Sequence, residues 1–177
     1  MKPPRIYISV LEIDVAIAAR DPRYQVISPA DSELFTIPSA HVEPARAGAI
    51  AVPRIALDVA RALRGGGVDH VWFRDFWDYP KIEETIASCS ALLAVVDEHY
   101  FSSTGKLIEL CYAAGQFAHT RPTIAPIPIF VLPLDEAYTR YRGLEKPGAW
   151  TITPPDAQND LTQLVANLSV AHAVPPN

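Results

Sequence analysis

One short stretch of the chain combines residue types that can take part in covalent chemistry. Residues 103–110 read Ser-Thr-Gly-Lys-Leu-Ile-Glu-Leu. We expect a helix to begin at Gly105 or Lys106, which places Glu109 about one turn into that helix. An acid at this position can complement the helix dipole, or it can simply be exposed to solvent. A carboxylate aimed into a crevice can instead stabilise a cation or attack a sugar carbon.

The elements around this stretch predict a parallel sheet. Alternating or continuous apolar patterns mark strands at residues 5–10, 68–74, 91–96 and 123–132. Apolar stripes at helical spacing mark helices at residues 53–64, 81–88, 105–115 and 156–168. Strands and helices therefore alternate along the chain. This order predicts an α/β fold, a flavodoxin-like doubly wound sheet that is mainly parallel, with about five strands and helices on both faces.

The remaining segments lack sustained periodicity. Loops are expected at residues 75–80, 97–103 and 134–150. Residues 21–51 contain Pro22, Pro29, Pro38 and Pro44. We expect this segment to be an irregular insertion over one end of the sheet, with room for a short helical turn. The length of 177 residues fits a single domain with one sizeable core.

The carboxyl ends of the strands are the place to look for a site, because ligands of doubly wound folds bind there. The loops at that end begin at Val10, Asp75, Asp97 and Pro133. Tyr7 and Ser9 lie in the first predicted strand and can reach this crevice. For Tyr7, a place in the core is the competing interpretation.

Side chains in the loops at this end are further candidates for ligand binding. Asp75 and Asp78 can bind sugar hydroxyls or be ordinary loop acids, and Asp97 can serve a site or a turn. Ser103 can hydrogen-bond a ribose hydroxyl or cap the following helix. The aromatic residues of the DFWDYP segment, 75–80, can stack on a base or contact a partner protein.

Composition excludes several classes of protein. The net charge is −5 and the chain has no basic run, which argues against nucleic-acid and membrane-surface binding. A nucleotide ligand stays possible, because backbone N–H groups alone can hold a phosphate. No signal peptide and no apolar run of membrane-spanning length is present, so we expect a cytoplasmic protein. Cys89 and Cys111 are expected to be reduced core thiols, and the five scattered histidines predict no metal site.

Residues 89–115, CSALLAVVDEHYFSSTGKLIELCYAAG, resemble the central strand, loop and helix of two related families. Tyr100, Ser103 and Glu109 match the pattern of the TIR domain. The second family is the nucleoside 2-deoxyribosyltransferase group, which includes nucleotide N-hydrolases. Its pattern is matched by Ser103, Gly105, Glu109, Leu110 and Ala113.

The wider chain is more similar to the TIR domain. Residues 7–9, Tyr-Ile-Ser, resemble the first TIR strand, and residues 71–96 resemble its second strand, loop, helix and third strand. The segment PIPIFVLP and the late Trp150 resemble its last portion. The chain departs from the TIR pattern at Gly105, where Trp is expected. It departs from the deoxyribosyltransferase pattern at Ser90, where Asp is expected, and residues 21–51 belong to neither pattern.

Both families imply an enzyme that cleaves an N-glycosidic bond with a helix-borne glutamate, here Glu109. The TIR resemblance implies a NAD hydrolase or cyclase, and the alternative is a nucleoside 2-deoxyribosyltransferase or nucleotide N-hydrolase. Substrate contacts are expected from Tyr7, Ser9, Asp75, Asp78, Asp97, Ser103 and Gly105. The nucleotide or nucleoside is the substrate and no cofactor is expected. TIR domains often associate, so a homo-oligomer and a separate partner protein are expected, and a non-enzymatic interaction module is the third hypothesis.

Overall fold

A five-stranded parallel sheet forms the centre of the protein, as seen in a computed structural model that describes residues 4–36, 50–74, 78–115, 125–136, 150–152 and 161–170. Its strands are β1 (Arg5–Val10), β5 (Asp69–Val71), β6 (Ala91–Val96), β7 (Ile129–Pro133) and β8 (Trp150–Ile152). The spatial order is β5-β1-β6-β7-β8, and every neighbouring pair is parallel. Numbered along the chain, this order is 2-1-3-4-5, which is the flavodoxin-like arrangement. The predicted fold class is confirmed.

Alternation along the strands builds two separate apolar cores, one on each face of the sheet. Ile6, Ile8 and Val10 of β1 pack in one core, whereas Tyr7 packs in the other. The six residues of β6 are all buried and divide between the two cores in the same way. Successive side chains of a strand point to opposite faces, so Ser9 belongs to the same face as Tyr7.

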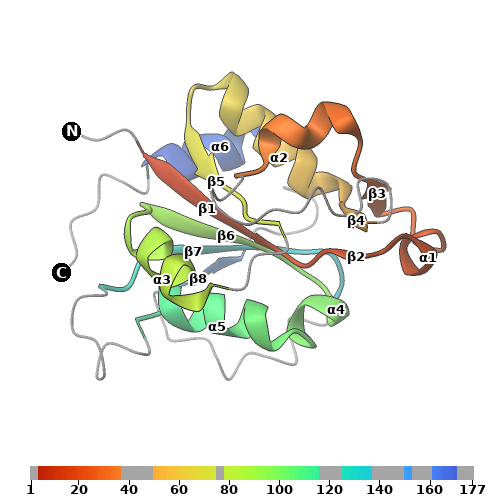
Figure 1. Cartoon of the computed structure of the whole chain (residues 1–177). Helices are drawn as coiled ribbons and strands as arrows, with labels where there is room; N and C mark the ends of the chain where they lie inside the picture. The colour runs from red at the N-terminus through yellow and green to blue at the C-terminus, as the bar shows by residue number, and fades with distance from the viewer. Residues whose placement is uncertain are drawn as a thin grey trace.

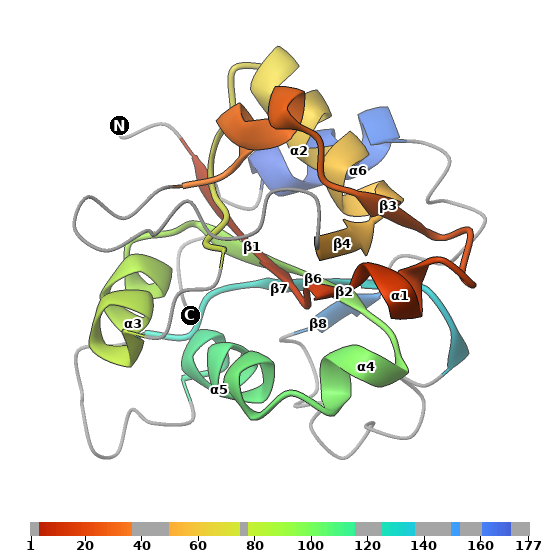
Figure 2. The same ribbon diagram turned by 45° about the vertical axis from the view of Figure 1, so that its right-hand side comes forward.

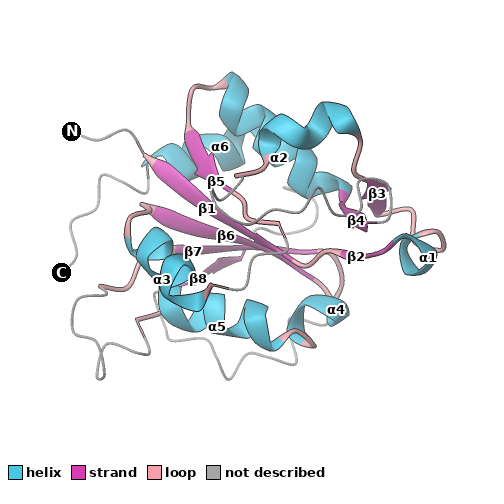
Figure 3. Cartoon of the chain, in the orientation of Figure 1, coloured by secondary structure: helices cyan, strands magenta, loops and turns pink. Residues whose placement is uncertain are grey.

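Helices cover both faces of the sheet, with α2 and α6 on one side and α3 and α5 on the other (Figure 1). Their bounds are α2 (Arg54–Gly65), α3 (Tyr79–Ala87), α5 (Thr104–Ala113) and α6 (Leu161–Val170). In α2, the buried Leu57, Ala60 and Leu63 lie three apart, on the stripe that faces the sheet. The helix stops where Gly67 takes a φ of 70°, a conformation that favours glycine. Figure 3 shows the strands enclosed between these helices.

A second, antiparallel sheet is formed by three short strands, β2 (Ile13–Asp14), β3 (Tyr24–Val26) and β4 (Ile50–Pro53), in the order β2-β4-β3. It lies beside α1 (Val15–Ala18), and η1 (Pro29–Leu34) follows β3 (Figure 2). The short helical turn expected within residues 21–51 is present as η1, but the segment is not otherwise irregular where it is described, because β3 and the start of β4 pair in this sheet. Strands this short carry no readable periodicity, and their stability comes from pairing between segments distant in sequence.

Several predicted boundaries also need correction. The loop expected at residues 97–103 contains the one-turn helix α4 (Glu98–Phe101), whose Tyr100 backbone N–H is capped by the Asp97 carboxylate. The loop expected at 134–150 ends in β8, which pairs with β7. Strand β7 starts at Ile129 rather than residue 123, since Pro126 and Pro128 have no N–H to donate. No helix in the described part of the chain is long and apolar enough to cross a membrane.

Candidate functional site

A cavity of about 160 Å³ lies at the carboxyl end of β1, where the strand order of the main sheet reverses. Three parts of the chain line it. They are the loop after β1 (Val10, Leu11, Glu12), the segment from β5 into α3 (Phe73, Tyr79, Ile82) and the start of α5 (Ser103, Gly105, Lys106, Glu109). Ligands of doubly wound sheets bind at this reversal point, so the cavity is the candidate site.

Glu109 is a buried carboxylate in the wall of this cavity, with only 4% of the residue exposed. It is the sixth residue of α5, counted from Thr104. The interpretation of Glu109 as an exposed acid is therefore excluded, and the helix dipole acts mainly within the first turn. Its neighbours Leu110 and Ala113 pack in the core between α5 and the sheet. These apolar contacts fix the rotation of the helix and turn Glu109 towards the end of β1.

Both oxygens of the Glu109 carboxylate have partners. The Ser9 hydroxyl donates to Oε2 at 2.5 Å, and the Lys106 ammonium lies 2.8 Å from Oε1. Ser9 is completely buried, while the Lys106 and Glu109 side chains are 17% and 6% exposed. A hydroxyl and an ammonium both stabilise negative charge, so they offset the free energy that burial of the carboxylate costs.

Two tyrosines lie beside this carboxylate in the interior. The Tyr100 hydroxyl is 2.7 Å from Ser9 Oγ, and the Tyr100 side chain is fully buried. Burial, with the nearby Glu109 carboxylate adding to it, raises the pKa of Tyr100 well above its ordinary value. Tyr7 is 1% exposed and packs in the core, and burial followed by the charge of Glu109 also raises its pKa. The structure thus places Tyr7 behind the site rather than in the cavity wall.

Ser103 and Gly105, both predicted to contact substrate, do line the cavity. Ser103 is also the N-cap of α5, because its hydroxyl oxygen accepts from the Lys106 backbone N–H at 3.4 Å. The two alternatives for Ser103, a cap and a place in the site, are therefore compatible. Together with Glu109, these residues are the predicted ones that the structure brings together in the cavity wall. Ser9, also predicted to contact substrate, is completely buried and reaches the cavity only through its hydrogen bond to Glu109.

The predicted aspartates have other surroundings. Asp97 is 2% exposed, and its carboxylate accepts from the Tyr100 backbone N–H at 2.8 Å and from the Tyr24 hydroxyl. Asp78 is exposed and caps α3, accepting from the Lys81 backbone N–H at 3.2 Å. Both carboxylates thus cap helices. The third candidate, Asp75, lies outside the described residues.

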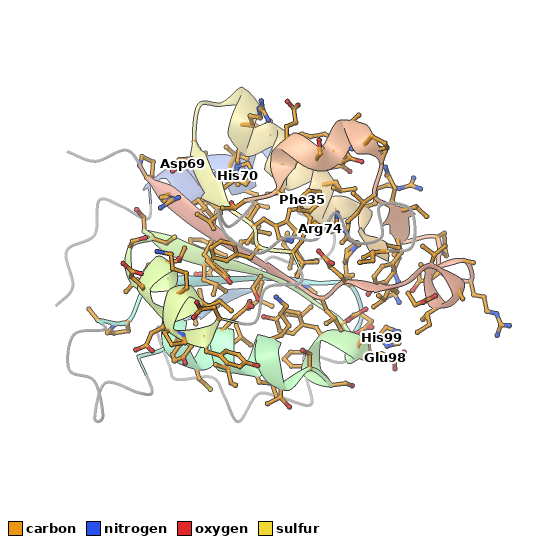
Figure 4. All side chains as sticks on the ribbon, viewed as in Figure 1. Phe35, Asp69, His70, Arg74, Glu98 and His99 are labelled. Atoms are coloured by element: carbon orange, nitrogen blue, oxygen red, sulfur yellow. The ribbon has the colours of Figure 1, made fainter. Side chains whose placement is uncertain are left out.

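Two charged residues of the cavity wall, Lys106 and Glu12, are absent from the sequence-based predictions. Lys106 precedes Glu109 by three residues, a spacing that places side chains on one helix face and could have revealed the pair. Glu12 pairs with Arg74 at 3.1 Å, and the Arg74 guanidinium lies 5.0 Å from the centre of the Phe35 ring. Arg74 and Phe35 lie close together in Figure 4. Only the position of Glu12 after β1 could have suggested it.

Searches for related proteins add no further assignment. No protein-family model matches the chain, and neither a curated protein nor a solved structure matches it. Within the described ranges, no group of three or more His, Cys, Asp or Glu side chains is arranged to hold a metal ion. The case for a function therefore depends on the geometry around Glu109.

Proposed function

We propose that this protein cleaves the N-glycosidic bond of NAD or a related nucleotide, with Glu109 as the catalytic carboxylate. The observation that carries the proposal is a carboxylate that is 4% exposed yet lines a cavity at the reversal point of a doubly wound sheet. Burial of a carboxylate is energetically unfavourable, and buried ionisable groups that line a cavity are frequent in active sites.

A buried carboxylate favours a reaction whose transition state carries positive charge on a carbon atom. When the bond from C1′ to the base nitrogen breaks, its electron pair leaves with the base and C1′ becomes cationic. Glu109 stabilises that cation electrostatically or captures C1′ in a covalent bond. Water then adds to C1′ and releases one proton to solvent. In NAD the departing nicotinamide starts as a cation and leaves neutral, so it needs no proton from an acid.

The cavity walls fit this kind of substrate. Phe73 and Tyr79 both line the cavity, and aromatic faces attract cations such as the nicotinamide ring. The volume of about 160 Å³ is below the range of about 300–1,000 Å³ found for pockets that enclose drug-sized ligands. The cavity therefore takes the ribosyl end where the bond is cleaved, and the rest of a dinucleotide lies outside it.

A nucleoside 2-deoxyribosyltransferase or nucleotide N-hydrolase is the second candidate. The observation in its favour is that Ser103, Gly105 and Glu109, which match the pattern of that group, all line one cavity. The pattern's Asp position is occupied by Ser90, which lies at the opposite end of the sheet and contacts the Arg5 backbone. We place NAD first because the resemblance to the TIR domain covers more of the chain.

The test compares wild-type protein with Glu109→Gln, incubated with NAD and separately with a mixture of deoxynucleosides. Glutamine keeps the shape of the side chain and removes its charge. Chromatography measures the released base. We expect nicotinamide release from the wild type, and a loss of at least about 100-fold in Glu109→Gln, because electrostatic stabilisation of the transition state is the main contribution.

The matched control is Glu83→Gln, since Glu83 is also buried, at 6% exposed, but lies on α3 away from the cavity wall. Its nicotinamide release should equal that of the wild type. Release of a purine or pyrimidine in place of nicotinamide would transfer the protein to the deoxyribosyltransferase group. If folded, concentrated wild-type protein releases no base at all, the enzymatic proposal fails and the interaction module remains.

A further inference from the structure

We propose that Ser9 and Tyr100 are positioning residues, which hold Glu109 so that its Oε1 atom is the oxygen presented to the substrate. The inference rests on the proposed function of Glu109. It assigns different roles to the two carboxylate oxygens and gives a role to a buried tyrosine that does not line the cavity.

The direction of the hydrogen bonds follows from the number of protons available. A serine hydroxyl carries one proton, and Ser9 donates it to Glu109 Oε2 at 2.5 Å. The 2.7 Å contact between Ser9 and Tyr100 must then use the phenolic proton of Tyr100. Because burial and the Glu109 charge raise the pKa of Tyr100 well above its ordinary value, this phenol keeps its proton. The result is a chain in which Tyr100 donates to Ser9 and Ser9 donates to Glu109.

These two hydrogen bonds join three elements that are distant in sequence. Tyr100 belongs to α4, Ser9 to β1 and Glu109 to α5. Ser9 and Tyr100 are both 0% exposed, so water does not compete with either hydrogen bond. Without Tyr100, the Ser9 hydroxyl could rotate to another acceptor, and Glu109 would lose the contact that fixes the plane of its carboxylate. Catalysis is sensitive to such displacements, since a shift of about 1 Å can cost about 100-fold in rate.

The other carboxylate oxygen of Glu109, Oε1, is bound by a side chain of the cavity wall, unlike Oε2. Its partner is the Lys106 ammonium at 2.8 Å, and Lys106 lines the same cavity. The lysine side chain is long and flexible, so it can leave Oε1 without any rearrangement of the sheet. A cationic sugar carbon takes the place of that ammonium beside Oε1. Oε2 cannot be approached in this way, because it is bound by the completely buried Ser9.

The kinetic test uses Ser9→Ala, Tyr100→Phe and the double variant, each assayed for nicotinamide release from NAD. We expect kcat to fall about 10-fold or more in Ser9→Ala, which loses a hydrogen bond to a charged group. We expect KM to change less than about twofold, because the substrate does not touch either residue. In the Ser9→Ala background, Tyr100→Phe should have no further effect, since its path to Glu109 is already broken.

Thr85→Ala is the control. Thr85 is a buried hydroxyl that bonds the Lys81 carbonyl within α3, so its loss removes a buried hydrogen bond outside the chain of three residues. Its kcat should equal that of the wild type. Thermal melting verifies that each variant is folded, and Tyr100→Phe keeps the shape of the core if Ser9→Ala fails to fold. Unchanged kcat in both single variants, with an active wild type, would overturn the proposal, and so would additive losses in the double variant.

A second measurement does not depend on activity. A hydroxyl proton held between Ser9 and the Glu109 carboxylate should give a proton resonance downfield of the backbone amides. This resonance should be present in wild type and Thr85→Ala, and absent in Ser9→Ala and Glu109→Gln. Its absence from the wild type would remove the structural basis of the proposal. Its presence in a protein that cleaves no NAD would show that the proposed function had failed and that the hydrogen-bonded chain had not.

Discussion

Both side chains of the Lys106–Glu109 ion pair are largely buried, which gives this pair energetic consequences that an exposed ion pair lacks. Its side chains are 17% and 6% exposed, so water does little to screen either charge. Removing one partner from such a pair leaves an uncompensated charge inside the protein. Loss of either partner should therefore lower the stability of the fold as well as change the candidate site.

Lys106→Met is the change that tests this view. Methionine keeps most of the apolar stem and removes the ammonium, which leaves the carboxylate with the Ser9 hydroxyl and the nearby Tyr7 phenol. We expect the free energy of unfolding to fall by about 1–3 kcal/mol, less than for a fully buried pair because Lys106 is partly exposed. Chemical denaturation measures this fall. Adding Glu109→Gln should recover most of it, since glutamine needs no counter-ion.

Lys81→Met is the matched control, because Lys81 and Glu84 form an ion pair with the same spacing on α3. Their side chains are 54% and 73% exposed, so the loss should stay below about 0.5 kcal/mol. Equal losses at the two sites would show that burial of the Glu109 pair is energetically unimportant. A double variant no more stable than Lys106→Met would mean that the ammonium stabilises the helix in another way.

At the level of single residues, the sequence is enough to single out Glu109, but it does not predict which side chains bind Glu109. A carboxylate between Ile108 and Leu110 stands out, because a helix packed on a sheet buries such positions. Asp97 stands out equally at the end of β6, yet it caps α4 and binds the Tyr24 hydroxyl. The two acids cannot be told apart by sequence, since the difference lies in which distant side chains reach them.

Elements differ in how far local sequence determines them. Residues 5–10 and 91–96 are predicted with the bounds that the structure has, because strands buried on both faces have strong apolar patterns. By contrast, β8 has three residues and owes its place to pairing with β7. The strands of the small sheet have two to four residues each and depend on pairing in the same way. Local patterns cannot reveal such partners.

The small antiparallel sheet is attached to the main sheet through Tyr24 of β3. Its hydroxyl donates to Asp97 at the end of β6, and burial together with this bond raises the pKa of Tyr24. We expect Tyr24→Phe to lower the free energy of unfolding by about 1–3 kcal/mol, because a buried carboxylate loses a donor. Chemical denaturation provides the measurement. The exposed Ile17→Thr serves as a control, with a change within about 0.5 kcal/mol.

A second variant, Asp97→Asn, separates the contribution of the hydrogen bond from other effects of Tyr24→Phe on stability. In an Asp97→Asn background the carboxylate charge is gone, so the additional loss from Tyr24→Phe should be much smaller. Coupling of this kind is expected for side chains in direct contact. If the two losses simply add, the hydrogen bond contributes little and the small sheet is held to the main sheet by apolar contacts, such as those of Val52 in the core it shares with β1 and β6.

At the scale of the whole molecule, half of the buried polar side chains among the described residues lie at the carboxyl end of the main sheet. Six polar side chains are buried among the described residues, and Ser9, Asp97 and Glu109 lie on or just beyond β1 and β6 or in α5 against them. The two apolar cores supply the stability that such groups cost. Buried polar groups beside a cavity, as Glu109 is here, are a common feature of functional sites.

The molecule also carries a half-buried histidine away from that region, His70, and we expect its titration to affect the stability of the protein. His70 of β5 bonds the Leu34 carbonyl through Nε2 at 3.0 Å, which links the edge of the sheet to η1. Burial lowers the pKa of His70, while the Leu34 carbonyl and Asp69 oppose this change and Arg64 adds to it. The unfolded chain therefore binds a proton to His70 more readily than the folded protein does.

Folding stability should consequently depend on pH through His70. Because the folded-state pKa lies below the unfolded value of about 6.5, the contribution of His70 is fully present above that pH. It is lost as the pH falls through the folded-state pKa, where the folded protein must accept the proton as well. Thermal melting between pH 7.5 and 5.5 measures the effect. We expect the wild type to lose more stability over this window than His70→Gln, which can still donate to Leu34 but does not titrate. Parallel curves for the two proteins would show that protonation of His70 costs the folded state nothing, and that its bond to η1 survives in the charged form.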